Sequence, residues 1–232
     1  MHEEVIAKRA KIPPHHTLTS LSLTHVQFSG DDIYSKIFAH LTLSPLAIIC
    51  GYIAVVLTTR DLTVVTMFAG QLLNEGINFV LKRLVKQARP TEYLGDGYGM
   101  PSSHSQFMAY FAAYMILLVY RNGASSGIVS PHFISAVVTL WSLLVVYSRV
   151  HLYYHTWQQV VAGSICGTLI GVGYYFFTQK FLRSKGMQDW MLDNPLGRWA
   201  HIVDREQMDH VYRWEWEQFQ QWRKISQGKK SD

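Results

Sequence analysis

An uninterrupted run of 23 residues without a formal charge, Ile37 to Thr59, is the feature that most constrains how this chain can fold. The hydrocarbon core of a bilayer is roughly 30 Å thick, and a helix needs about 20 mostly apolar residues to cross it. Composition agrees with a membrane setting, because only 16% of the 232 residues are charged, against about 25% in soluble domains. The run therefore predicts a first membrane-spanning helix.

Four later segments continue this pattern, and they cover residues 62–85, 105–120, 131–147 and 156–178. The first of the four is interrupted by Asn74, Glu75 and Asn78, whose helical spacing indicates that they face the interior of a bundle rather than lipid. We therefore predict an all-α fold, a polytopic transmembrane helical bundle with about five spans. This bundle would occupy residues 37–180, between a polar N-terminal segment (1–36) and a polar tail (181–232).

The tail holds five of the seven tryptophans and much of the positive charge. Tryptophan is enriched at membrane–water interfaces, so the tail predicts an interfacial helix. The net charge of +5 is not gathered into one arm or stripe, which argues against a nucleic-acid partner.

Five spans place the ends of the second and fourth spans and the starts of the third and fifth on one membrane face, together with the N-terminal segment. We call this face the site side. Apart from the three polar segments described next, the site side holds four Lys and Arg residues, and the opposite side holds twelve. Because cytoplasmic loops are rich in Lys and Arg, the site side is predicted to face a lumen or the exterior.

Three polar segments fall on the site side: KRLVKQARP (82–90), PSSH (101–104) and SRVHLYYH (148–155). They contribute the cations Lys82, Arg89 and Arg149. Arg presents a planar fork that matches phosphate oxygens, and Lys presents a point charge. The glycines at 95, 97 and 99 precede a helix N-terminus, where backbone N–H groups and the helix dipole favour anions. The segments together predict an anion site.

Two histidines, His104 and His155, complete this set of residues. One could act as nucleophile and the other as proton donor, which is the division of labour that phosphoryl transfer without a metal requires. An alternative pairs His155 with His151 at i, i+4 on a helix as metal ligands, although no third ligand is evident.

Each segment taken alone has a simpler interpretation. Ser103 with Gln106 fits a helix capping box, and Lys82 with Arg83 and Lys86 fits a cationic anchor at the membrane surface. The convergence of all three segments favours a catalytic site over these separate roles.

The order and spacing of the three segments resembles the signature of the type 2 phosphatidic acid phosphatase (PAP2) superfamily. The longer stretch GYGMPSSHSQF, with GQLLNEGIN before it, is similar to the dolichyl diphosphate phosphatases of the endoplasmic reticulum. The resemblance covers approximately residues 40–180. It implies a catalytic transmembrane domain that uses no metal and no cofactor.

The resemblance also implies residue roles. His155 would attack phosphorus to form a phosphohistidine, and His104 would protonate the leaving group. The residues that would hold the phosphoryl oxygens are Lys82, Arg89, Ser102, Ser103 and Arg149.

Two positions depart from the superfamily pattern. Ser103 replaces a usual Gly, and its backbone N–H remains available. Gln159 replaces a usual Asp four residues after the nucleophile. At i+4 on one helix, its side-chain carbonyl can accept the ring N–H of His155 and fix the tautomer. It cannot supply the negative charge of an aspartate, so we expect orientation without the full electrostatic push.

The function implied by the resemblance is hydrolysis of dolichyl (polyprenyl) diphosphate to dolichyl monophosphate and phosphate. It would occur at the lumenal face of the endoplasmic reticulum membrane and recycle the carrier lipid for protein N-glycosylation. Two alternatives stay open. One is a broader lipid phosphate phosphatase acting on phosphatidate or a sphingoid phosphate. The other is a catalytically silent membrane protein that binds lipid phosphates.

Overall fold

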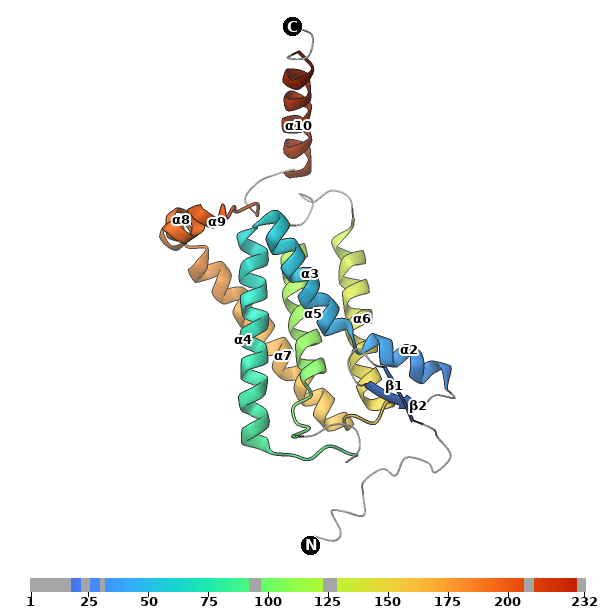
Figure 1. Ribbon diagram of the computed structural model, residues 1–232. Helices are drawn as coiled ribbons and strands as arrows, with labels where there is room; N and C mark the ends of the chain where they lie inside the picture. The colour runs from blue at the N-terminus through green and yellow to red at the C-terminus, as the bar shows by residue number, and fades with distance from the viewer. Residues whose placement is uncertain are drawn as a thin grey trace.

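Five long helices run side by side through the middle of the computed structural model (Figure 1). The structure describes residues 18–21, 26–29, 32–91, 97–122, 129–206 and 211–228. The five helices are α3 (Ser44–Thr59), α4 (Leu62–Val85), α5 (Ser103–Asn122), α6 (Pro131–His151) and α7 (Trp157–Phe177). Each of them overlaps one of the five predicted segments, and the predicted all-α polytopic bundle is confirmed.

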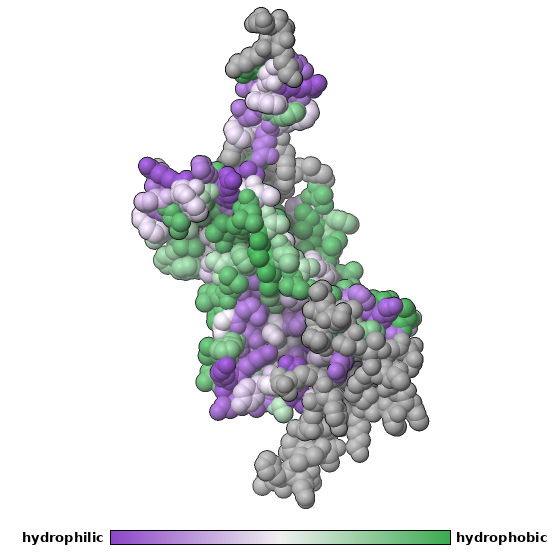
Figure 2. All heavy atoms as spheres, in the orientation of Figure 1, coloured by the Kyte–Doolittle hydropathy of each residue, from purple (hydrophilic) through white to green (hydrophobic). Residues whose placement is uncertain are grey.

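Four stretches among the described residues are long and apolar enough to cross a membrane: Ile33–Thr59, Leu62–Val85, Pro131–His151 and Trp157–Leu182. Large apolar side chains on the outer faces of these helices are exposed, among them Leu57, Phe79 and Leu143. Figure 2 shows the resulting hydrophobic surface over the middle of the bundle and hydrophilic surface toward its lower end. The exposed apolar surface is what contact with lipid requires.

Helix α5 is less apolar than the four candidate spans because it lies inside the bundle. It packs against α4, α6 and α7. Phe107, Met108, Tyr110 and Tyr114 on this helix are almost completely buried. A helix enclosed by other helices needs no hydrocarbon-facing surface, so it can carry serine, glutamine and tyrosine side chains at membrane depth.

A stripe of glycines on α7 explains the close packing of α5 and α7. At Gly163, Gly167 and Gly171, an added Cβ atom would lie 2.9 Å or less from a backbone carbonyl oxygen of α5 or of the residue just before it. Small residues at helix interfaces let backbones approach closely within membranes. The stripe therefore holds the start of α7 against the start of α5.

The predicted first span is divided into two helices, although the stretch Ile33–Thr59 is long and apolar enough to cross a membrane as predicted. Helix α2 (Ile33–Leu41) ends before α3 begins at Ser44. Pro45 has no N–H to continue the helical ladder. The hydroxyls of Thr42 and Ser44 donate to the carbonyls of Ala39 and Leu41 at 2.7 Å each, which helps to terminate α2.

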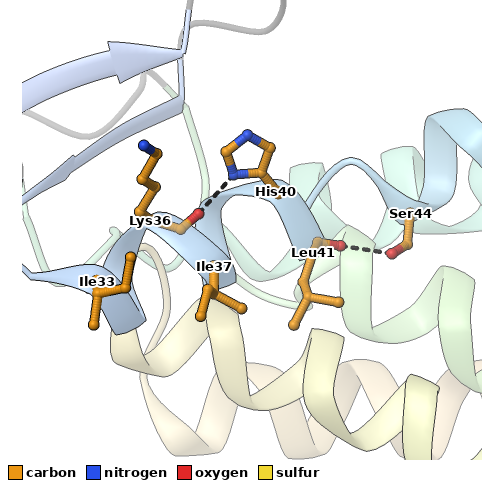
Figure 3. Close-up of a pocket in the computed structure, with 6 residues that line it drawn as sticks. All are labelled: Ile33, Lys36, Ile37, His40, Leu41 and Ser44. Carbon is orange, nitrogen blue, oxygen red and sulfur yellow. Dashed lines mark hydrogen bonds between the residues drawn. The ribbon is translucent and has the colours of Figure 1, made fainter.

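Helix α2 lies across the site-side end of the bundle (Figure 1) and is amphipathic. Figure 3 shows Ile33, Ile37 and Leu41 along one side of a shallow groove, with Lys36 and His40 on another side. The exposed side chain of Ile33 suits the surface of a bilayer. His40 Nδ1 donates to the carbonyl of Lys36 at 2.7 Å, so this imidazole makes a local contact within α2.

A hairpin that the sequence did not predict covers the site-side end near α2. Strands β1 (Leu18–Leu21) and β2 (Val26–Ser29) pair antiparallel. Val26 and Phe28 pack against Ala39 of α2 and against Leu152 and Tyr154, which follow α6. Part of the N-terminal segment, which was predicted only to be polar, thus supports the third polar segment.

The opposite end of the bundle carries the tail. Arg60 ends α3 with a left-handed conformation, and Asp61 caps α4 through a 2.7 Å bond from the N–H of Thr63. After α7 come a π-helical turn, η2 (Thr178–Leu182), and the short helices α8 (Lys185–Asp193) and α9 (Pro195–Ala200). Helix α10 (Val211–Gly228) projects away from the bundle (Figure 1). Its predicted role as an interfacial helix stays a prediction.

Candidate active site

Four helix ends meet at the site-side end of the bundle: the ends of α4 and α6 and the starts of α5 and α7 (Figure 1). The three polar segments of the sequence lie at these ends. Helix α2 and the β1–β2 hairpin lie at the same end, and α8 to α10 lie at the other. This is the arrangement that the succession of five spans predicted.

His155 lies in the short connection between α6 and α7. Helix α6 ends at His151, Tyr153 has a positive φ of 58°, and the N–H groups of Tyr154 and His155 both donate to the carbonyl of Arg149 at 3.1 Å. We had expected His151 and His155 to lie on one helix, but His155 lies outside α6, which ends at His151. His151 instead contacts the hydroxyl of Ser35 on α2, 3.2 Å from its Nε2.

Gln159 makes the predicted contact with His155, although by a different route from the one expected. Thr156 caps α7, so His155 lies outside the helix that carries Gln159. The distance from His155 Nδ1 to Gln159 Oε1 is 3.1 Å. An amide oxygen can only accept, so Nδ1 carries the proton and Nε2 keeps its lone pair. The neutral ring therefore presents Nε2 as a nucleophile.

The amide nitrogen of Gln159 points toward the first polar segment. It donates to the carbonyl of Ala88 at 2.8 Å and to Oε1 of Gln87 at 3.2 Å. The backbone carbonyl of Gln159 accepts from the N–H of Ser102 at 3.1 Å. One residue thus joins all three polar segments, and it fixes their relative positions at the site.

Three cations act electrostatically on His155. Its burial and the charges of Arg149, Arg89 and Lys82 lower the pKa of the imidazole from 6.5 to about 3, while the hydrogen bond to Gln159 acts in the opposite direction. A low pKa keeps the ring neutral at physiological pH, which a nucleophile requires. The charges of all three predicted anion-binding side chains thus act on one ring.

Arg149 is held by the residue before His155. It is only 4% exposed, and its guanidinium carbon lies 4.2 Å from the centroid of the Tyr154 ring, a cation–π contact. The Tyr154 hydroxyl accepts from the N–H of Gln27 on β2 at 2.8 Å. Arg149 Nε is buried and has no hydrogen-bond partner among the described residues, so it is a donor available for an anion.

The second polar segment forms the start of α5. Ser102 is fully buried, and its Oγ accepts from the Ser105 hydroxyl at 3.1 Å. Lys82 Nζ donates to Ser103 Oγ at 3.1 Å. This bond links a predicted cation to a predicted phosphate-binding serine.

The capping-box interpretation of Ser103 and Gln106 does not describe the contacts of Gln106. Its amide nitrogen donates to Asn74 Oδ1 at 3.0 Å, and its oxygen accepts from Asn78 Nδ2 at 2.7 Å. Asn74 and Asn78 therefore face the bundle interior as predicted, and Glu75 between them is half-buried.

The glycine-rich loop approaches Gln159 closely. An added Cβ at Gly99 would lie 2.7 Å from Gln159 Nε2, and the N–H of Gly99 donates to the carbonyl of Gln87 at 2.7 Å. Gly97 has a φ of 91°, a conformation that favours glycine. Gly95 lies outside the described residues.

His104 is half-buried on the first turn of α5, and its Nε2 lies 3.1 Å from the carbonyl oxygen of Thr42 at the α2–α3 break. A carbonyl only accepts, so Nε2 carries a proton and Nδ1 is the nitrogen left for proton exchange. Arg149, His155 and Lys82 all interact electrostatically with this ring. Both imidazoles thus belong to one charged site.

The PAP2 superfamily matches residues 63–183, a stretch that contains all three polar segments. The chain belongs to the PAP2 superfamily. Its likeness to a solved PAP2 protein, the transmembrane phosphatidylglycerolphosphate phosphatase of Bacillus subtilis, has a TM-score of 0.53 at 19% identity. It covers 65% of this chain and 79% of that chain, and it shows the shared PAP2 fold.

Curated PAP2 relatives are more similar in sequence. Dolichyldiphosphatase 1 of Homo sapiens is 37% identical over 172 residues, which are 70% of this chain and 72% of the human protein. Dolichyldiphosphatase 1 of Dictyostelium discoideum is 36% identical, covering 86% of this chain and 88% of that protein. The dolichyldiphosphatase of Saccharomyces cerevisiae is 32% identical, covering 84% of each.

Within this PAP2 site, sequence reasoning missed four contributors: Thr42, Gln87, Ala88 and Tyr154. Thr42 and Ala88 act through backbone carbonyls, which leave no trace in side-chain chemistry. Tyr154 and Gln87 lie within predicted segments, and the position of Tyr154 between Arg149 and His155 was the available signal. The described part of the chain holds no cluster of three His, Cys, Asp or Glu side chains suited to a metal.

Proposed function

We propose that this PAP2 protein hydrolyses dolichyl (polyprenyl) diphosphate to the monophosphate and phosphate. The observation that carries the proposal is the environment of His155. A neutral imidazole with a free Nε2 lies within the field of Arg149, Arg89 and Lys82. The identity of 37% to a protein named dolichyldiphosphatase supports this choice of lipid.

In the first step, His155 Nε2 attacks the terminal phosphorus of the diphosphate, and a P–N bond forms. The bond from that phosphorus to the bridging oxygen breaks, and its electron pair stays on the bridging oxygen. His104, which holds a second proton on Nδ1 when the anionic substrate is bound, gives this proton to the bridging oxygen, and the lipid monophosphate leaves. Lys82, Arg89, Arg149 and the start of α5, with Ser102 and Ser103, hold the phosphoryl oxygens during this step.

In the second step, a water molecule attacks the phosphohistidine. His104, now neutral at Nδ1, takes a proton from the water. The P–N bond breaks, its electron pair returns to His155 Nε2, and phosphate leaves. Gln159 keeps the proton on Nδ1 of His155 throughout, so the same nitrogen is used in both steps.

The location of the site at a bilayer surface suits an amphiphilic substrate. The polyprenyl chain stays in hydrocarbon while its phosphates reach the cations at the ends of α4 and α6. The distribution of Lys and Arg, twelve on the side of the tail against four, supports a lumenal site in the endoplasmic reticulum. There the reaction would return the carrier lipid for N-glycosylation.

The proposal is tested with purified protein in detergent micelles containing a chelator. Initial rates of phosphate release are measured with dolichyl diphosphate, phosphatidate and a sphingoid phosphate, with His155→Ala as control. We expect turnover of the diphosphate, at least about 10³-fold loss in His155→Ala, and an acid-labile phosphoprotein after rapid quenching. Equal turnover of phosphatidate would favour the broader phosphatase, and binding without release would favour the silent binder.

A further inference from the structure

The surroundings of Gln159 are built for a neutral amide. Its nitrogen donates to a backbone carbonyl, that of Ala88, at 2.8 Å. Its oxygen accepts from His155 and from the N–H of Thr156. A carboxylate here would place its second oxygen against the Ala88 carbonyl, where two acceptors would face each other. The fold therefore disfavours an acidic side chain at this position.

The neutral amide of Gln159 adds no negative charge beside the cations of the site. Arg149, Arg89 and Lys82 all act on His155. Among the described residues, Glu75 is the acidic side chain whose charge acts on Lys82, and it lies seven residues earlier on α4. A carboxylate at position 159 would be in direct contact with the nucleophile. It would therefore weaken the attraction of the site for anions much more strongly than Glu75 does.

We propose that the neutral Gln159, supported by Gln87, makes this site selective for a lipid diphosphate over a lipid monophosphate. The inference rests on the proposed function. A phosphomonoester carries about −1.5 to −2 at pH 7, and a diphosphate carries about one further negative charge. A site that lacks a carboxylate at position 159 attracts the more highly charged lipid more strongly than a site that has one. The monophosphate, which is the product, is then released rather than held.

The leaving group adds to the same selectivity. An aspartate beside the nucleophilic ring would stabilise the positive charge that develops as the P–N bond forms. Gln159 provides orientation without this charge, and that suffices when the leaving group is a phosphomonoester with a second pKa of about 6. A lipid monophosphate would have to expel a far more basic alkoxide. Both effects favour the diphosphate.

The test compares Gln159→Asp with Gln159→Asn, two side chains of the same size that differ in charge. The ratio of kcat/KM for polyprenyl diphosphate to kcat/KM for polyprenyl monophosphate is measured in micelles with one chain length. We expect this ratio to be about tenfold lower in Gln159→Asp than in Gln159→Asn, which keeps the wild-type ratio at a reduced rate. Equal ratios in the two variants would mean that Gln159 only positions His155.

A second measurement does not depend on activity. Thermal stabilisation by inorganic diphosphate and by orthophosphate is compared for wild type, Gln87→Glu and Gln87→Ala. Gln87 is exposed and contacts Gln159 rather than His155. We expect the advantage of diphosphate to shrink in Gln87→Glu and to persist in Gln87→Ala. The same advantage in both would overturn the inference, whereas a wild-type protein that releases no phosphate from polyprenyl diphosphate would overturn the proposed function itself.

Discussion

His155 shows how burial and neighbouring charge act together on one side chain. Removal from water and three cations all disfavour the imidazolium, and only the bond to Gln159 opposes them. The two histidines and three cations could be named as candidates because imidazole, guanidinium and ammonium groups suit phosphate binding and transfer, and their roles stay predictions. The carbonyls of Thr42 and Ala88 were not, because any residue supplies the same backbone oxygen.

The lowered pKa of His155 predicts an acid-dependent loss of stability. In the unfolded chain this imidazole takes up a proton near pH 6.5, whereas in the folded chain it does so only near pH 3. Between these values the unfolded state binds more protons, so falling pH lowers the free energy of unfolding, by about 2 kcal/mol at pH 5. Thermal unfolding in micelles at pH 7.5 and pH 5 should show a smaller difference between the two pH values in His155→Gln. An unchanged difference would contradict the low pKa.

The role of His104 predicts a dependence on the leaving group. His104→Ala removes a general acid, a contribution of typically about 10²–10⁴-fold. The loss should be at least about tenfold greater for a lipid monophosphate, whose alkoxide needs protonation, than for a lipid diphosphate. Initial rates with both lipids of one chain length measure this. Equal losses would show that His104 does not protonate the leaving group.

At the scale of elements, the length of the apolar segments identified the helices, but hydrophobicity alone could not predict which helix lies inside the bundle. Helix α5 lies innermost because the glycines of α7 allow its backbone to approach closely. This close approach depends on residues of two helices, so it cannot be predicted from one segment. The division of the first span into α2 and α3 depends on Pro45 and on two hydroxyls that end α2. For the β1–β2 hairpin, the alternation of apolar and polar residues in VQFS (26–29) was an available but short signal.

The glycine stripe predicts that the cost of replacing a glycine on α7 depends strongly on its position. Gly167→Leu would place a side chain into the backbone of α5 at Gln106 and should destabilise the protein by at least about 3 kcal/mol, since overpacking alone typically costs 1–3 kcal/mol. Gly173→Leu is the matched control, because no described atom lies within 4 Å of a Cβ there. Thermal unfolding and phosphate release are measured for both. Similar behaviour of the two variants would show that α5 and α7 are not in close contact.

At the scale of the whole molecule, the tail is tied to the bundle end opposite the site. Arg183 pairs with Asp204 at 2.7 Å and with Glu206 within the tail, and it donates to the hydroxyl of Thr63 on α4 at 2.7 Å. Arg121 on α5 reaches Glu206 of the tail at 2.8 Å. Leu62 donates to the carbonyl of Val203 at 2.8 Å. Sequence reasoning placed the boundary of the catalytic domain near residue 180, and that boundary stays a prediction. The spacing of residues along the sequence did not predict these ion pairs, because their partners are far apart in the chain.

These contacts predict that Arg183 stabilises the fold without taking part in chemistry. Arg183→Ala would leave two nearly buried carboxylates without their main partner and should lower the free energy of unfolding by about 3–5 kcal/mol. Arg213→Ala, which breaks an exposed pair with Glu217 on α10, should change it by less than about 0.5 kcal/mol. Thermal unfolding in micelles compares them. Equal stability of the two variants would mean that the ion pairs of Arg183 do not stabilise the fold.

The interruption between α2 and α3 has a consequence for how this protein meets its membrane. Inside an unbroken helix every carbonyl is occupied by the amide four residues ahead. The chain instead stops its first hydrophobic stretch early, and the oxygen of Thr42 becomes the partner of an imidazole proton. A substitution such as Pro45→Leu that restored a straight helix would lengthen the anchor and deprive His104 of its acceptor. The carbonyl oxygen of Thr42 can serve either a longer membrane helix or the ring of His104, but not both.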